Sequence, residues 1–206
     1  LYNLWFTAEA AEKHRQMERR FFVPTFVLTT DSNSDLPQEY LEQHEIAVLY
    51  LGYTMAGESY GKGRSMPDAE FYAAMRKGEL PTTSAVNFED AKRVFSEYME
   101  QGMDVLHIAF SSALSGSCSA AVAAAKEAEQ EHPGRKAVVV DSLCASLGQG
   151  LLVHKLVQMR DAGASLEETA KWAEENKLHV CHIFTVDDLF HLHRGGRVSK
   201  ATAIFG

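Results

Sequence analysis

Cysteine and basic residues are both scarce in this chain of 206 residues. The three cysteines, Cys118, Cys144 and Cys181, are odd in number and far apart, which argues against a disulfide framework and gives no zinc-ligand spacing. We expect all three to be reduced core thiols of a cytoplasmic protein. Lysine and arginine number 20 against 28 aspartates and glutamates, for a net charge of -8. No basic stripe is therefore present that would bind the phosphates of a nucleic acid.

Long apolar runs and nucleotide-binding motifs are missing as well. A transmembrane helix needs about 18 or more consecutive apolar residues, so we expect none here. Neither a Gly-x-Gly-x-x-Gly fingerprint nor a Gly-x-x-x-x-Gly-Lys phosphate loop occurs, which leaves nucleotide binding without support. What the chain does have is a hydrophobic content of 46%, enough for one good core or two small domains.

The most informative stretch is 105–117, in which a buried apolar strand runs into a serine-rich turn containing Ser111, Ser112 and Ser115. An alanine-rich, helix-forming run follows at 120–128. The first N–H groups of such a helix are unpaired, and together with the serine hydroxyls they favour binding of an anion. The alternative is that these serines only form the turn and cap the helix.

A second hydroxyl cluster follows Pro81 and consists of Thr82, Thr83 and Ser84, which we expect in a loop leading into a helix. The rest of the chain alternates short apolar segments with amphipathic ones, which favours a parallel α/β sheet. Ligands of such sheets lie beyond the carboxyl ends of the strands, where Asp31, Ser112 and Asp141 all fall. We expect strands at 26–30, 46–54, 105–110, 137–140 and 179–186, a hairpin at 55–62, and helices at 1–22, 36–44, 65–77, 87–101, 120–131, 145–162, 165–177 and 187–193.

Other polar residues have less specific patterns. Asp187 and Asp188 are either an acid/base pair or, as adjacent carboxylates at a helix start usually are, caps. His191 and His193 lack the acids or cysteines that would complete a metal site, so we expect none. His107, inside the central strand, is interpreted as a hydrogen-bonded core residue.

The serine turn also raises the alternative of a serine hydrolase acting on acyl esters or thioesters. Such an enzyme needs a general base held against the hydroxyl and usually places its serine in a Gly-x-Ser-x-Gly elbow. The chain contains no such elbow. Binding without catalysis is therefore favoured.

Five motifs, taken together and in order, resemble the DegV family of bacterial fatty-acid-binding proteins. Each is weak alone, but the ordered set is specific and covers roughly 26–206. They are Leu28-Thr29-Thr30-Asp31-Ser32, Leu80-Pro81-Thr82-Thr83-Ser84, the serine run 111–117, the run 141–150 that begins Asp141-Ser142, and Val186-Asp187-Asp188-Leu189 with Gly195-Gly196-Arg197-Val198-Ser199.

The resemblance implies a DegV-like α/β fold. Residues 1–25 are then an N-terminal extension, 26–144 a parallel-sheet α/β domain that binds the lipid head group, and 145–206 the start of a second α/β domain. Because the family's second domain continues beyond this point, we expect it to be truncated here. Apolar surface should then be exposed at Leu147, Leu151, Leu156 and 201–205, and be covered by self-association or by a separate C-terminal fragment.

The resemblance also implies a function. The chain is expected to bind a long-chain fatty acid, to need no cofactor or metal, to have no catalytic activity, and to present the lipid to a fatty-acid kinase subunit. Thr83 and Ser112 are the foremost candidates for contact with the carboxylate, and Thr82, Ser84, Ser111 and Ser115 are the others. Arg197 is expected to contact the ligand head or a partner, or to cap the preceding helix.

Overall fold

A four-stranded parallel sheet forms the centre of the molecule. The computed structural model describes residues 25–186 and 188–205, so the helix expected at 1–22 lies outside the described residues. The strand order is β2 (Ala47–Leu49), β1 (Phe26–Asp31), β6 (Asp104–Ala109) and β7 (Ala137–Asp141). In register, Leu28 lies beside Leu106, and Leu106 lies beside Val138. The parallel α/β prediction is confirmed.

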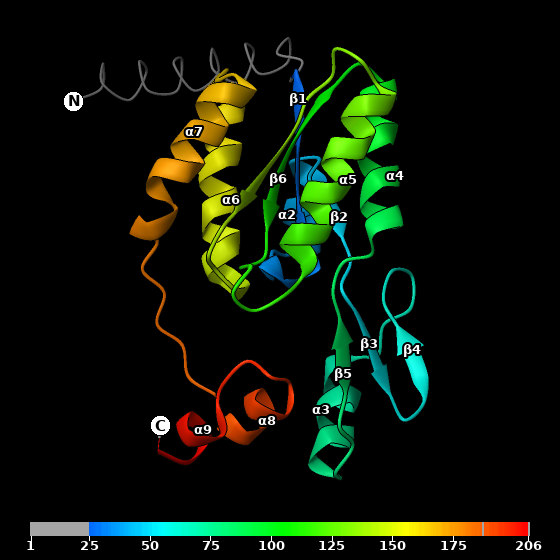
Figure 1. Cartoon of the computed structure of the whole chain (residues 1–206), viewed down its shortest axis with the longest axis vertical. Coiled ribbons are helices and arrows are strands. Elements are labelled where there is room, and N and C mark those ends of the chain that lie inside the picture. Colours follow the sequence, from blue (N-terminus) through cyan, green and yellow to red (C-terminus); the bar gives the residue numbers. More distant parts are fainter. Residues whose placement is uncertain (1–24, 187, 206) are drawn as a thin grey trace, which may run out of the picture.

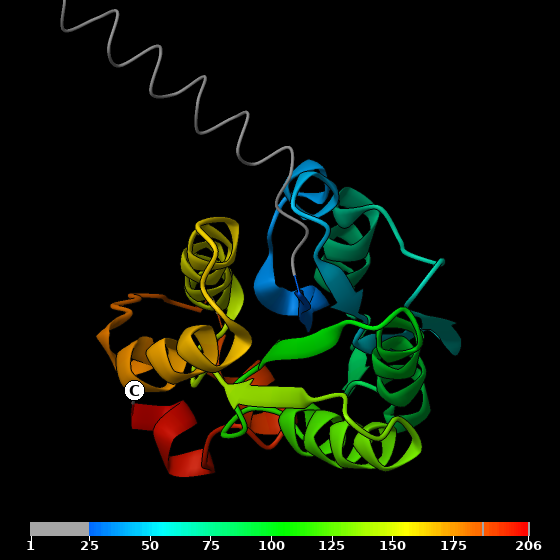
Figure 2. The same cartoon turned by 90° about the horizontal axis from the view of Figure 1, so that it is seen from above.

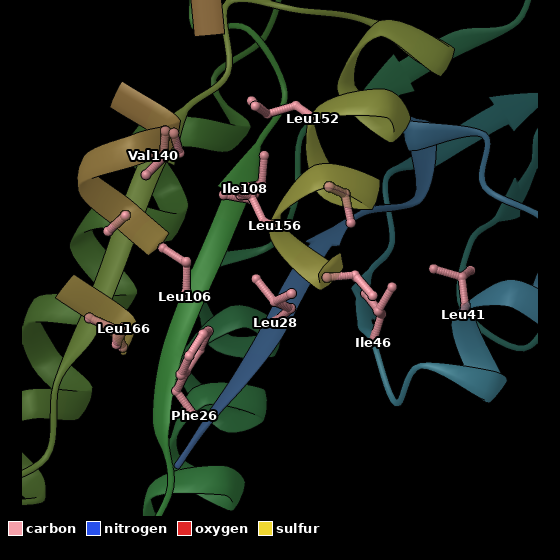
Figure 3. Close-up of a cluster of buried hydrophobic side chains, with 14 residues drawn as sticks. Phe26, Leu28, Leu41, Ile46, Leu106, Ile108, Val140, Leu152, Leu156 and Leu166 are labelled. Atoms are coloured by element: carbon pink, nitrogen blue, oxygen red, sulfur yellow. The ribbon is translucent and has the colours of Figure 1, made fainter. Parts of the chain in front are cut away.

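Helices cover both faces of this sheet (Figure 2). Since side chains alternate along a strand, Phe26 and Leu28 enter one core whereas Val27 enters the other. The first core is closed by α2 (Gln38–Gln43), α6 (Ser146–Asp161) and α7 (Leu166–Asn176). Figure 3 shows Leu152 and Leu156 of α6 above the strands of this core. The second core is closed by α4 (Phe88–Glu100) and α5 (Ser117–Glu131).

The predicted helix starts are confirmed at two places. The Asn87 side chain accepts hydrogen bonds from the first-turn N–H groups of α4, at 2.8 Å from the Glu89 nitrogen. Ser165 and Glu168 form a reciprocal capping box at the start of α7. Side-chain caps of this kind satisfy N–H groups that have no partner inside the helix.

A small lobe, residues 52–84, projects from the carboxyl edge of the main sheet (Figure 1). It comprises β3 (Gly52–Met55), β4 (Glu58–Tyr60), α3 (Asp68–Arg76) and β5 (Thr82–Ser84), with an antiparallel strand order of β4-β3-β5. Two predictions were wrong here. The strand expected at 46–54 is divided between two sheets as β2 and β3, and the expected loop at 82–84 is β5, because the edge of β3 offers its backbone to these residues.

The chain after α7 also departs from expectation. A short 3-10 turn, η2 (Lys177–His179), is followed by 180–186 without regular structure, where we expected a strand. No strand among the described residues pairs with this segment, and a strand without a partner has no backbone hydrogen bonds to hold it. Helices α8 (Leu189–Arg194) and α9 (Lys200–Phe205) follow this segment. Asp188 caps α8 as predicted, and Asp187 lies outside the described residues.

The predicted apolar surface is found only in part. Leu147 and Leu151 are 62% and 46% exposed, as expected, but Leu156 is fully buried because the 3.6-residue period of α6 turns it toward β1 and β6. Packing is continuous across the domain boundary predicted at 144/145, since α6 and α7 share a core with β1. The domain division therefore stays a prediction. In the described part of the chain, no helix has the length and apolarity needed to span a bilayer.

Candidate functional site

The serine turn, residues 110–117, begins where β6 ends and is fixed by the strands on both sides. Three successive backbone N–H groups donate to protein acceptors: Phe110 to Asp31 Oδ2 at 2.6 Å, Ser111 to the Cys144 carbonyl at 3.1 Å, and Ser112 to Asp141 Oδ1 at 3.1 Å. These residues meet at the carboxyl edge of the sheet, as the sequence indicated. These three N–H groups are therefore engaged within the protein, and the Ser112 side chain is the part of residue 112 that is left for a ligand.

The serine hydroxyls of the turn differ in what they can reach. Ser111 is buried, and its Oγ accepts a hydrogen bond from the Ala113 N–H at 3.3 Å. Ser115 Oγ lies 2.9 Å from Ser117 Oγ, which in turn accepts from the Val86 N–H at 3.1 Å. Ser112 is exposed to solvent. Ser112 is therefore the hydroxyl best placed for a ligand, whereas Ser111 and Ser115 also hold the turn together.

The three residues of the second hydroxyl cluster do not share one face, because side chains alternate along β5. Thr83 pairs with Tyr53, and its Oγ1 accepts a hydrogen bond from Arg197 Nη2 at 3.3 Å. Its neighbours Thr82 and Ser84 point to the opposite face of the strand. Ser84 lines a different hollow, with Gly52 and Lys62 among its walls. Of this cluster, Thr83 alone is brought toward the C-terminal segment by a hydrogen bond.

Arg197 connects the two clusters. Besides the bond to Thr83, its Nε donates to the Leu114 carbonyl of the serine turn at 3.3 Å, and its Nη1 donates to the Gly195 carbonyl at 2.8 Å. A Cβ on Gly195 would lie 2.5 Å from Nη1, so a side chain there would push the guanidinium out of this position. The bond to Gly195, the C-cap residue of α8, fits the cap alternative, but the other two bonds reach well beyond that helix.

A hollow open to solvent lies between the serine turn and Arg197. It has a volume of about 320 Å³ and is walled by Ser112, Leu114, Ser115 and Arg197, with Ala85 and Gly116 among the remaining residues. A hydroxyl and a guanidinium beside an apolar side chain are suited to a carboxylate that continues into a hydrocarbon chain.

The cysteines are not part of this chemistry. Burial, supported by the nearby carboxylates of Asp141 and Asp31, raises the pKa of the Cys118 thiol to about 11, and burial also raises the pKa of Cys144. Both thiols are therefore protonated and inert at neutral pH. The prediction for Cys181 was wrong: this residue is exposed, because the strand expected to bury it does not form.

The described histidines contact residues other than the serines of the turn. His107 is buried, with Nδ1 2.9 Å from Thr29 Oγ1, in agreement with its predicted core role. His193 Nδ1 lies 3.1 Å from the Val198 carbonyl, and the described residues contain no cluster of three or more metal-binding side chains. Asp141 accepts the N–H of Ser112, and within the described chain no base is hydrogen-bonded to the Ser112 hydroxyl.

Sequence reasoning missed the roles of Asp31 and Asp141 as acceptors for the serine turn. The Asp-Ser pairs at the ends of their strands were the available signal, because a carboxylate at the end of a parallel strand faces the turn of its neighbour.

A family model and individual relatives point to the same family. Residues 25–206 match a family model described as "uncharacterised protein, DegV family". A DegV domain-containing protein of Clostridium perfringens is 40% identical over 183 residues, covering 88% of this chain and 63% of the relative. Another from Lactococcus lactis is 37% identical over 185 residues, covering 88% of this chain and 64% of the relative. The chain thus spans less than two thirds of the length of these relatives.

Solved structures share the fold. A DegV family protein from Thermus thermophilus, described by its fatty-acid binding, has a TM-score of 0.76 at 35% identity and covers 88% of this chain and 64% of its own. DegV from Bacillus subtilis, described as a fatty-acid-binding protein, has a TM-score of 0.73 at 30% identity, with 89% and 64% covered. A stearic-acid-binding protein from Eubacterium ventriosum has a TM-score of 0.75 at 29% identity, with 85% and 61% covered.

Proposed function

Because this chain belongs to the DegV family, we propose that it binds a long-chain fatty acid whose carboxylate is held by Thr83, Ser112 and Arg197. The observation that carries the proposal is the position of Arg197, whose guanidinium donates both to Thr83 and to the serine turn that bears Ser112. Hydroxyl and guanidinium donors to a carboxylate form charge-assisted hydrogen bonds. Several structurally similar relatives are described as fatty-acid-binding proteins, which supports the same ligand class.

The acyl chain supplies most of the affinity in this proposal. Each buried methylene contributes about 0.8 kcal/mol before ordering costs are subtracted. Leu114 lines the hollow, and Leu147 and Leu151 of α6 and Phe190 of α8 are exposed apolar side chains. The carboxylate then sets the orientation of the lipid, and the tail extends from the hollow over apolar surface.

The direct test is the affinity of a fluorescent long-chain fatty acid for the variant Thr83→Ala/Ser112→Ala. Each lost hydrogen bond to a charged group costs about 1.5–3 kcal/mol, so we expect binding to weaken at least about tenfold. Thr54→Ala/Ser119→Ala is a matched control, with one exposed hydroxyl removed from β3 and one from α5. Equal affinity of the site variant and the control would reject the assignment of Thr83 and Ser112.

We further propose that the chain is a carrier without catalytic activity of its own. It would present the carboxylate to a fatty-acid kinase subunit that transfers a phosphoryl group from its own nucleoside triphosphate to the carboxylate oxygen. The absence of a base bonded to the Ser112 hydroxyl, within the described residues, supports the carrier over a serine hydrolase. Turnover of a fatty-acyl ester that Ser112→Ala abolishes, or labelling of Ser112 by a serine-directed phosphonate, would reverse this conclusion.

The identity of the lipid is a separate question. Mass spectrometry of lipid extracted from the purified protein reads chain length and unsaturation directly. We expect a single class of long-chain fatty acid, and extraction of no lipid together with no binding in solution would count against the proposed function.

A further inference from the structure

Asp31 is a fully buried carboxylate at the carboxyl end of β1, with two oxygens in different situations. Oδ2 accepts the Phe110 N–H at 2.6 Å. Oδ1 has no hydrogen-bond partner among the described residues, although it is equally buried. A buried carboxylate without full compensation is costly, which indicates a role other than stability.

The neighbour of Oδ1 is His107, whose Nε2 lies 3.4 Å away and also has no hydrogen-bond partner in the described part of the chain. The other ring nitrogen of His107 is 2.9 Å from Thr29 Oγ1. The imidazole ring is therefore held between Thr29 on one edge and the Asp31 carboxylate on the other. The buried ring lies against Oδ1 and limits the rotation of the carboxylate, whose Oδ2 faces the serine turn.

The serine turn depends on this carboxylate. Phe110 is the first residue after β6, and the position of its backbone sets where the next two residues, Ser111 and Ser112, leave the sheet. Asp141 holds the same turn from the opposite side, but it is only partly buried and divides its Oδ1 between the N–H groups of Ser112 and Leu143. Asp31 is therefore the less replaceable of the two acceptors.

We propose that Asp31 is a positioning residue of the head-group site: its carboxylate, oriented by His107, fixes the serine turn and thereby places the Ser112 hydroxyl against the fatty-acid carboxylate. Asp31 does not itself touch the ligand in this arrangement. The inference rests on the proposed function, and it adds two residues, one on each of two neighbouring strands, that act on the ligand only through the turn.

Asp31→Asn is the sharpest variant, because it keeps the shape of the side chain and removes the charge. We expect the affinity for a fluorescent long-chain fatty acid to fall about tenfold, the effect of a misplaced charge-assisted hydrogen bond. Phe26→Leu is the control, since Phe26 is buried at the other end of the same strand. It should lower the melting temperature and leave the affinity unchanged.

Amide NMR of the ligand-free protein tests whether the loss of the carboxylate reaches Ser112, whose amide a role confined to stability would leave in place. The short bond to Asp31 should place the Phe110 amide proton far downfield, and Asp31→Asn should bring it upfield and shift the Ser112 amide as well. The same comparison with Phe26→Leu should leave both amides in place. If Asp31→Asn does not fold, His107→Asn tests the same chain of contacts and should weaken binding in the same direction.

The outcomes separate the two levels of the proposal. If the wild-type protein does not bind fatty acid, the proposed function fails and the positioning role fails with it. If the wild type binds and both Asp31→Asn and His107→Asn bind equally well, with the Phe110 and Ser112 amides unmoved, the positioning role is overturned and the proposed function stands.

Discussion

At the scale of single residues, the candidate site is built from side chains whose neighbours leave them little freedom. The alternation of β5 fixes the direction of the Thr83 side chain. The carboxylates of Asp31 and Asp141 hold the backbone of the turn that carries Ser112. Gly195 leaves room for the Arg197 side chain to fold back. The chemistry of the site therefore depends as much on the residues behind these three as on the three themselves.

Arg197→Ala removes the guanidinium that joins Thr83 to the serine turn. We expect fatty-acid affinity to fall about tenfold or more, because a charge-assisted bond to the carboxylate is lost. Arg194→Ala is the control, since Arg194 pairs with Asp188 at 3.1 Å and not with either hydroxyl cluster. Unchanged lipid affinity with loss of acyl-phosphate formation by a kinase partner would instead place Arg197 on a docking surface, and no change in either assay would leave only the cap.

The three cysteines should react with a thiol reagent at very different rates. With the pKa of Cys118 raised to about 11, only about 0.1% of this thiol is ionised at pH 8, and burial raises the pKa of Cys144 in the same direction. Cys181 is exposed. In a spectrophotometric thiol assay we expect one fast thiol per native wild-type chain and none in native Cys181→Ser. The unfolded wild-type chain should show three. A second fast thiol at pH 8 would contradict the buried positions of Cys118 and Cys144.

At the scale of elements, α6 shows how one helix is fitted to the rest of the chain by its glycines. A Cβ on Gly150 would lie 2.6 Å from the backbone oxygen of Ser34, in the 3-10 turn η1 (Ser32–Ser34). A Cβ on Gly148 would meet only the side chain of His182, in a segment without regular structure. Replacing glycine by alanine should therefore change the free energy of unfolding differently at positions 148 and 150, which lie about half a helical turn apart.

Gly150→Ala is expected to lower the free energy of unfolding by about 1–3 kcal/mol, because overpacking against backbone outweighs the gain in helix propensity. Gly148→Ala is the matched variant and should leave stability unchanged or raise it by up to about 1 kcal/mol, since His182 can turn away. Urea denaturation followed by circular dichroism measures both. Equal stabilities of the two variants would show that η1 yields to the added methyl group.

At the scale of the whole molecule, the small lobe and the pair of helices α8 and α9 both lie beyond the carboxyl edge of the main sheet. Figure 1 shows both below the main sheet, and the extended segment 180–186 connects the sheet layer to α8. Apolar side chains are exposed along this segment and on α6: Ile183 is 102% exposed, Phe184 74% and Leu147 62%. Exposed apolar surface of this kind is commonly covered by another chain.

We expect the 206-residue chain to self-associate, or to be isolated with a companion fragment, as this surface favours burial. Light scattering and intact-mass analysis separate these two outcomes. Leu147→Ser/Leu151→Ser should reduce the association, whereas Val122→Ser, at a 50% exposed position on α5 against the other face of the sheet, should not. A monodisperse 22.8 kDa monomer without bound peptide, without dye binding and with a cooperative melt would refute the prediction.

The sequence by itself was sufficient wherever the determining interactions are local. The helices at α4, α5 and α7, the caps at Asn87 and Ser165, and the strands β1, β6 and β7 follow from propensity, capping and apolar runs within a few residues. The ordered motifs were sufficient for the family, because their residue types and order are read directly from the chain.

Only the tertiary structure decided how distant residues combine. The bond from Arg197 to Thr83 joins residues 114 apart in the sequence, and that from Phe110 to Asp31 joins residues 79 apart. The strand at 82–84, the loss of the strand at 179–186 and the burial of Leu156 likewise depend on which backbone or core lies alongside. Propensity and capping act over a few residues, whereas partners at these separations are set by the packing of the whole sheet.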